Sequence, residues 1–126
     1  FSEKIKFQDI RNLWNSMYLK YLNINLLNDT DGVLQDIHWY EGIFGYFPTY
    51  ALGAMMSSQI KYNCPYYEEF LKKPEPENIN NIANWLNKNI HQRASLYSSD
   101  EMLQNISGEK LNPSYYSRHL RERFLK

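Results

Sequence analysis

The chain is poor in cysteine, in net charge and in long hydrophobic runs. Its 126 residues include one cysteine, Cys64, so an internal disulfide is excluded, and a single thiol is typical of a reducing, cytoplasmic setting. The 14 Lys and Arg balance the 14 Asp and Glu, so no overall field would attract nucleic acid or an anionic membrane. The longest mostly apolar window, residues 43–56, is interrupted by glycine and proline and is shorter than the ~20 residues of a membrane span. We therefore expect a cytoplasmic protein without nucleic-acid or membrane partners.

Sustained alternation of apolar and polar residues is also absent, and helical spacing recurs instead. A helix that starts at Pro48 carries few charges on any face, which predicts burial on all sides. The pattern predicts an all-α protein, a compact helical array in a single domain, residues 1–126, with this helix at its centre. The segment 74–76 (Pro-Glu-Pro) is expected to be a stiff connector. Helices are predicted over residues 7–22, 33–39 (one or two turns), 48–62, 66–72, 79–90, 98–108 and 113–124.

No set of metal ligands is recognisable. The candidates are His38, Cys64, His91 and His119, and none has a partner one helical turn away, the spacing that zinc sites commonly use. The motifs H-E-x-x-H and G-x-S-x-G and a phosphate-binding loop are missing as well. We therefore expect this chain to bind no metal and not to be a complete hydrolase of a recognised type. The C-terminal basic residues are expected to remain solvated and to complement the negative end of the last helix dipole; they are Arg118, Arg121, Arg123 and Lys126.

One segment gathers polar and aromatic residues beside glycines. Residues 32–39 are GVLQDIHW, and residues 42–53 are GIFGYFPTYALG. A loop flanked by glycine can bring backbone and side chains close to a ligand, and polar groups that become buried need partners. The residues alone leave two interpretations open, a functional site or an aromatic loop that packs on a core.

This segment resembles the G-x-x-Q-D-x-H-W signature of the carboxypeptidase Taq family, followed by that family's F-G-Y-F-P-T-Y-x-L-G run. Residues 9–15 (DIRNLWN), 85–91 (WLNKNIH) and 108–113 (GEKLNP) are similar to further stretches of the family, so the resemblance covers roughly residues 7–124. Tyr40 and Glu41 depart from the pattern, because many members have small residues such as Ser-Gly there.

The resemblance implies a fold, an activity and a cofactor. Members of the family are cytoplasmic, mostly helical, commonly homodimeric zinc exopeptidases that remove C-terminal residues from peptides. Their zinc is held by the two His of an H-E-x-x-H helix and a downstream Glu, all upstream of the part that this chain resembles. The chain would then be the C-terminal part of a larger helical zinc-peptidase fold. Zinc would belong to the complete enzyme, and its ligands to a missing N-terminal part.

The resemblance also implies roles for residues of the signature. Tyr46 and His38 look like the Tyr and His that related helical zinc peptidases place in the cleft wall. There they donate hydrogen bonds to the oxyanion that forms when a metal-activated water attacks the peptide carbonyl. Gln35 and Asp36 would fix the imidazole of His38. Tyr50 is the residue that could exchange roles with Tyr46.

Three functional classes are consistent with these residues. The first is a portion of a metallocarboxypeptidase that supplies cleft wall and transition-state donors but no zinc ligands. The second is a non-catalytic helical binding or dimerisation module from a truncated gene, and the third is one half of a split peptidase. An apolar face is expected to remain uncovered and to favour homo-oligomers. One candidate surface consists of Tyr62, Tyr66, Tyr67 and Phe70.

Overall fold

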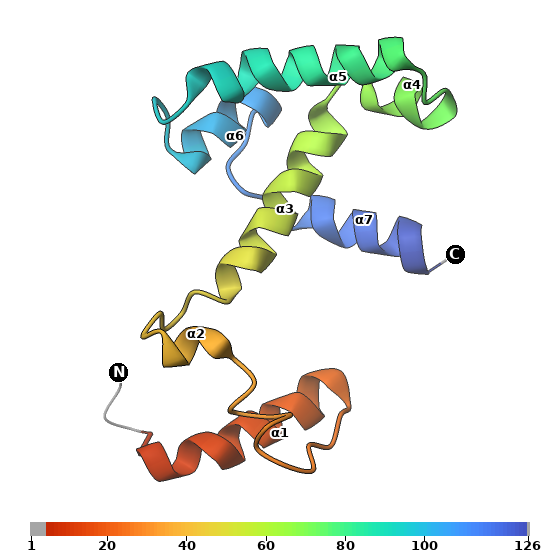
Figure 1. Cartoon of the computed structure of the whole chain (residues 1–126). Coiled ribbons are helices and arrows are strands. Elements are labelled where there is room, and N and C mark those ends of the chain that lie inside the picture. Colours follow the sequence, from red (N-terminus) through yellow and green to blue (C-terminus); the bar gives the residue numbers. More distant parts are fainter. Residues whose placement is uncertain (1–4, 126) are drawn as a thin grey trace. The chain divides into compact units, whose positions relative to one another are not determined.

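Helices joined by turns and loops form the protein. The computed structural model describes residues 5–125, and no strand occurs within that range, so the prediction of an all-α fold is confirmed. Figure 1 shows the helices along the chain. In chain order the elements are the short 3-10 helix η1 (Phe7–Asp9), α1 (Ile10–Leu22), α2 (Ile37–Tyr40), α3 (Pro48–Asn63), α4 (Tyr67–Lys72), α5 (Pro76–Asn89), the 3-10 helix η2 (His91–Arg93), α6 (Ser99–Ser107) and α7 (Ser114–Phe124).

The chain divides into two compact units, Phe1–Phe47 and Pro48–Lys126. The first unit contains α1 and α2, and the second contains α3 to α7. That residues 1–126 form a single helical domain stays a prediction.

Gly32 explains how the long loop of the first unit closes against itself. The residue is buried, and a Cβ atom there would lie 3.2 Å from the carbonyl oxygen of Asn28 and 3.2 Å from Cδ1 of Leu26. A side chain would therefore push the loop apart. An ion pair of 2.6 Å between Arg11 and Asp29 adds a link from the same loop to α1.

The start of α3 is less buried than its composition predicts. Ser58 and Gln59 are its buried residues, whereas every residue from 48 to 53 is exposed. The prediction that this helix is covered on all sides is therefore wrong for this chain, although its bounds are close to those predicted. The helices α6 and α7 contact α3, and the buried residues of α3, Ser58 and Gln59, lie in its second half.

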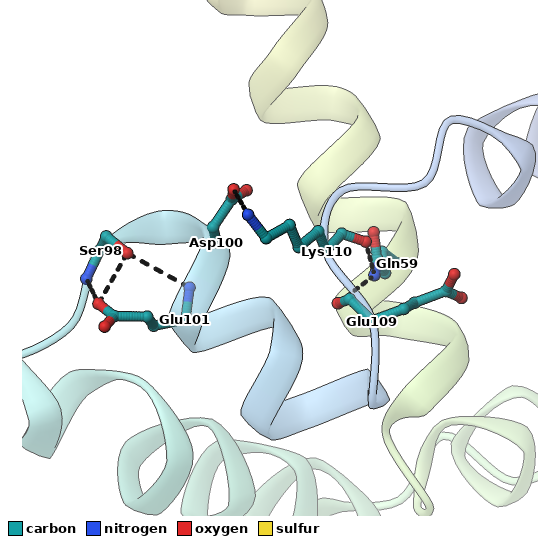
Figure 2. Close-up of polar contacts among 6 residues, drawn as sticks. All are labelled: Gln59, Ser98, Asp100, Glu101, Glu109 and Lys110. Atoms are coloured by element: carbon teal, nitrogen blue, oxygen red, sulfur yellow. Dashed lines mark hydrogen bonds and ion pairs between the residues drawn. The ribbon is translucent and has the colours of Figure 1, made fainter.

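A buried amide joins α3 to the segment between α6 and α7 (Figure 2). The side chain of Gln59 is fully buried, and its Nε2 donates to Oγ of Ser107 at 2.7 Å and to the carbonyl of Lys110 at 3.0 Å. Its Oε1 accepts from the backbone N–H of Asn112 at 2.9 Å. Gly108, at φ 79°, ends α6 and turns the chain towards this amide. Gln59 therefore fixes the path of the chain after α6.

Two helix starts in the second unit follow from local chemistry. Ser98 and Glu101 have the sequence spacing of a capping box and form one: the Glu101 carboxylate accepts from the Ser98 backbone N–H at 2.8 Å (Figure 2). Hydrogen bonds from Ser98 hold the pKa of the Glu101 carboxyl below its usual value. Pro76 is the first residue of α5 rather than part of a connector, because a fixed φ and a missing N–H suit the first helical turn.

Ala94 occupies a backbone conformation that L-residues avoid. It follows η2 with φ 45° and ψ −125°, and the N–H of Leu96 donates to the carbonyl of Arg93 at 3.0 Å. These values correspond to the second residue of a type II′ turn, a position that favours glycine. The turn therefore stores strain that the rest of the unit offsets.

Replacement of Gln59 by Met should lower the free energy of unfolding of this chain by about 2–4 kcal/mol, because the buried partners of the amide lose their hydrogen bonds. Chemical denaturation measures this change. Gln92→Met is the matched control, since Gln92 is exposed and should tolerate the same change within about 0.5 kcal/mol. Equal losses for the two variants would contradict the role assigned to Gln59.

Replacement of Ala94 by Gly should raise the free energy of unfolding by about 1 kcal/mol, because relief of the positive φ outweighs the added freedom of the unfolded chain. Ala83→Gly, at an exposed position of α5, should have the opposite sign and lower it by about 1 kcal/mol. Thermal melts of both variants test this pair. A lower melting temperature for Ala94→Gly would contradict the strain.

Candidate functional site

One carboxylate oxygen organises the start of α2. Asp36 is the N-cap residue, and its Oδ1 accepts from the backbone N–H of His38 at 3.0 Å. The same Oδ1 lies 2.6 Å from Nδ1 of His38, and the side chains of Asp36 and His38 are 10% and 16% exposed. With the carboxylate ionised, Nδ1 carries the proton of this contact, and Nε2 is the ring nitrogen that faces other groups. The same oxygen of Asp36 therefore both caps the helix and orients the imidazole.

Two glycines bring Tyr46 back over His38. Gly42 has φ 71°, and backbone N–H groups of Gly42 and Ile43 donate to the carbonyls of Trp39 and His38, which closes α2 with a Schellman motif. Gly45 has φ 79° and turns the chain again. The ring of Tyr46 then stacks on His38, with centroids 4.9 Å apart and planes at 26°.

Phe47 is a second aromatic residue in contact with His38. The Phe47 ring meets the imidazole edge-on, with centroids 5.8 Å apart and planes at 78°. Tyr46 remains 44% exposed, so its ring packs on the imidazole while part of the side chain is open to solvent. An imidazole and a phenol side by side can both donate hydrogen bonds to one developing negative charge.

The other two predicted site residues have different surroundings. Gln35 lies just before α2, and its Oε1 accepts from the hydroxyl of Tyr18 at 3.3 Å. Tyr50 lies in the first turn of α3, in the second unit, and is 58% exposed. The structure therefore brings Asp36, His38 and Tyr46 together within the first unit, and the roles of all five residues stay predictions.

The zinc that the resemblance implies does not fit the side chains of residues 5–125. No group of three His, Cys, Asp or Glu in this range could hold a metal ion. Nδ1 of His38 is committed to Asp36, and Nδ1 of His119 lies 3.0 Å from Nζ of Lys61. Cys64 is buried and directly follows α3.

A surface pocket of about 460 Å³ at the start of α6 was not foreseen in the sequence. Its charged groups are already matched, because Glu101 belongs to the capping box and Lys110 lies 3.3 Å from Asp100 (Figure 2). The one feature of the sequence that points to this region is the spacing of Ser98 and Glu101, and that spacing indicates the start of a helix rather than a ligand site. Its lining residues are Tyr97, Ser98, Asp100, Glu101, Gln104, Asn105 and Lys110.

A second polar cluster joins α3 to α7. The Tyr62 hydroxyl donates to Glu122 at 2.5 Å, and Nε of Arg118 donates to the same carboxylate at 2.7 Å while its guanidinium covers the Tyr62 ring. Burial and the hydrogen bond to Glu122 raise the pKa of Tyr62 to about 12, and the bonds from Tyr62 and Arg118 lower the pKa of Glu122. Arg118 is thus paired rather than only solvated, and Lys126 lies outside the described residues.

The uncovered apolar surface lies mainly outside the predicted tyrosine stretch. Tyr62, Tyr67 and Phe70 are half-buried, and Nζ of Lys61 lies over the rings of Tyr62 and Tyr67. Large apolar side chains of α1 are more open, with Met17 and Leu22 at 47% and 56% exposure. None of the helices between residues 5 and 125 is both long and apolar enough to cross a membrane.

Comparison with known proteins places the whole segment in one family. A profile of the carboxypeptidase Taq (M32) metallopeptidases matches residues 1–124. The chain is 37% identical to thermostable carboxypeptidase 1 of Pyrococcus furiosus and 34% identical to carboxypeptidase 1 of Bacillus subtilis, over 98% of its own length but 25% of theirs. The structure of metallocarboxypeptidase 1 of Trypanosoma cruzi is similar, with a TM-score of 0.83 and 37% identity, over 97% of this chain and 26% of that one. The chain thus spans about a quarter of these relatives.

The tyrosine of the α3–α7 cluster gives a pH prediction. Because the pKa of Tyr62 is raised from 10.0 to about 12 in the folded chain, its contribution to stability is complete below pH 10 and is lost as the pH rises from 10 to about 12. Absorbance titration of tyrosine at alkaline pH should therefore show a late step that Tyr62→Phe removes. Glu122→Gln should shift that step to lower pH, whereas Tyr66→Phe, at an exposed tyrosine, should leave it in place. An unchanged late step in Tyr62→Phe would contradict the assignment.

Proposed function

The chain belongs to the carboxypeptidase Taq (M32) metallopeptidase family, and from this premise we propose that it is part of an enzyme that removes C-terminal residues from peptides. It contributes a wall of the substrate cleft and hydrogen-bond donors for the transition state. Zinc and its ligands belong, in this proposal, to an N-terminal part of the enzyme outside this chain. The single cysteine agrees with a cytoplasmic location, and the open apolar side chains of α1 agree with a homo-oligomer.

The stack of Tyr46 on His38 is the observation that carries this proposal. The centroids of the two rings lie 4.9 Å apart in a segment of the first unit, and Oδ1 of Asp36 lies 2.6 Å from Nδ1 of the imidazole. An imidazole in van der Waals contact with a partly open phenol and fixed by a carboxylate is preorganised, because neither ring must reorient when charge develops nearby.

In peptide hydrolysis, hydrogen-bond donors such as His38 and Tyr46 can stabilise the charge that develops on the carbonyl oxygen. Attack on the scissile carbonyl moves negative charge onto its oxygen, and donors aimed at that position stabilise the transition state more than the ground state. The two proposed donors are Nε2 of His38 and the hydroxyl of Tyr46; for Nε2 to donate while Nδ1 donates to Asp36, both ring nitrogens must carry a proton. Oδ1 of Asp36 lies 2.6 Å from Nδ1 and fixes the direction of the ring, and Gln35 adjoins Asp36 in the chain. Tyr50 is the alternative to Tyr46.

Replacement of Tyr46 by Phe in the complete carboxypeptidase should lower kcat by a factor on the order of 10²–10³ and leave KM nearly unchanged, because one oxyanion donor is lost and the ring remains. Steady-state kinetics on a blocked dipeptide measure this, and the melting temperature is determined on the same variant. Tyr66→Phe is the matched control and should keep normal turnover.

A normal kcat with a lowered melting temperature in Tyr46→Phe would assign this residue to packing and make Tyr50→Phe the next variant. Loss of kcat in Tyr50→Phe alone would transfer the role to Tyr50. A normal kcat in both variants would favour the non-catalytic module over the enzyme wall.

A further inference from the structure

Two aromatic residues of α1 contact the segment that carries His38 on both of its sides. The Trp14 ring meets the Trp39 ring edge-on, with centroids 5.5 Å apart and planes at 83°, and Trp39 directly follows His38. The Tyr18 hydroxyl donates to Oε1 of Gln35 at 3.3 Å, and Gln35 directly precedes Asp36. All of these residues belong to the first unit.

Trp14 and Tyr18 also support each other. They lie four residues apart on one face of α1, and their rings stack with centroids 5.5 Å apart and planes at 24°. The helix continues for one more turn beyond Tyr18, to Leu22, so the pair lies on a regular helix rather than on a loop. Rings anchored in this way lose little freedom when they contact a third group.

The contacted segment needs such support. α2 has four residues, Ile37–Tyr40, and a helix of this length has no stability of its own. Asp36 and the Schellman motif determine its local shape, but they are part of the same short segment and cannot orient it on anything else. The contacts of α1 with Gln35 and Trp39, which flank Asp36 and His38 in the chain, orient the segment relative to α1.

The contacts of the Trp14 indole within the described residues are ring contacts, with Tyr18 and Trp39. Nε1 of Trp14 is buried and has no hydrogen-bond partner among residues 5–125. A phenylalanine would avoid this unfavourable burial of a donor. The larger ring offsets it by reaching both Tyr18 and Trp39 at once.

We propose that Trp14 and Tyr18 are positioning residues for His38: they act through Trp39 and Gln35 and keep the imidazole oriented towards the substrate carbonyl. This inference rests on the proposed function of His38 as a donor. Neither residue needs to touch the substrate. Their loss leaves the donor in place but widens the range of directions in which Nε2 points, which weakens the transition state more than substrate binding.

The test uses the complete carboxypeptidase and the variants Trp14→Phe and Tyr18→Phe. Each should lower kcat by roughly 2–10-fold with KM nearly unchanged, the range that one lost ring contact or neutral hydrogen bond supplies. Matched controls are Trp85→Phe in α5 and Tyr21→Phe in α1, which should keep normal kcat. Tyr21 is 71% exposed.

A double-mutant cycle separates positioning from general packing. In a His38→Ala background, Trp14→Phe and Tyr18→Phe should no longer lower kcat, because the group that they orient is gone. A purely structural role predicts the same fractional loss with and without His38. That additive result overturns the inference, and so does normal kcat in both single variants.

Nuclear magnetic resonance of ¹⁵N-labelled histidine gives a readout that does not depend on activity. The imidazole signals of His38, assigned with His38→Ala, should shift or broaden in Trp14→Phe and Tyr18→Phe but not in Trp85→Phe or Tyr21→Phe. Normal kcat in His38→Ala would refute the donor role of His38 itself, and the inference on Trp14 and Tyr18 is then decided by these signals alone. Unchanged signals in both α1 variants overturn it.

Discussion

The buried amide of Gln59 is the constraint on which the second unit depends. Leu103 and Cys64 are the buried apolar side chains among residues 5–125, so nonpolar burial alone does little to select one packing of α3 against its neighbours. An amide without access to water must satisfy both of its ends, and only one path of the chain after α6 presents Ser107, Lys110 and Asn112 to it. The polar contact therefore selects the arrangement, and the half-buried apolar residues add stability to it.

In the first unit, too, a polar side chain selects the local structure, but its partners are close to it in the sequence. Oδ1 of Asp36 serves the start of α2 and the imidazole of His38, so the local fold and the orientation of a candidate donor have one cause. Positive φ at Gly42 and Gly45 then returns Tyr46 to the same imidazole. In the longer enzyme that we propose, a wall built in this way keeps its geometry without help from the metal.

Sequence reasoning failed where a residue's role depends on contacts distant in the chain. Nothing in the sequence distinguishes Gln59 within its helix, yet it bonds to residues about 50 positions away, a spacing that no periodicity shows. The burial of α3 was overestimated because the composition of a helix shows that its faces can be buried, but not whether other elements of the chain cover them. Ala94 was missed as well, since alanine carries no turn signal and the strain appears only in φ and ψ.

The sequence by itself determined the helical class, most helix bounds, the capping box at Ser98 and the family, because these follow from local propensity, spacing of four residues or fewer, and continuous motifs. It also placed Asp36, His38 and Tyr46 near one another, since they lie within eleven positions of the chain. Only the tertiary structure decided that Trp14 and Tyr18 reach the segment of His38, and that Gln59 is buried. The physical reason is that these contacts join residues far apart in the chain. They form only when the loops between those residues close in one particular way, which local sequence patterns do not specify.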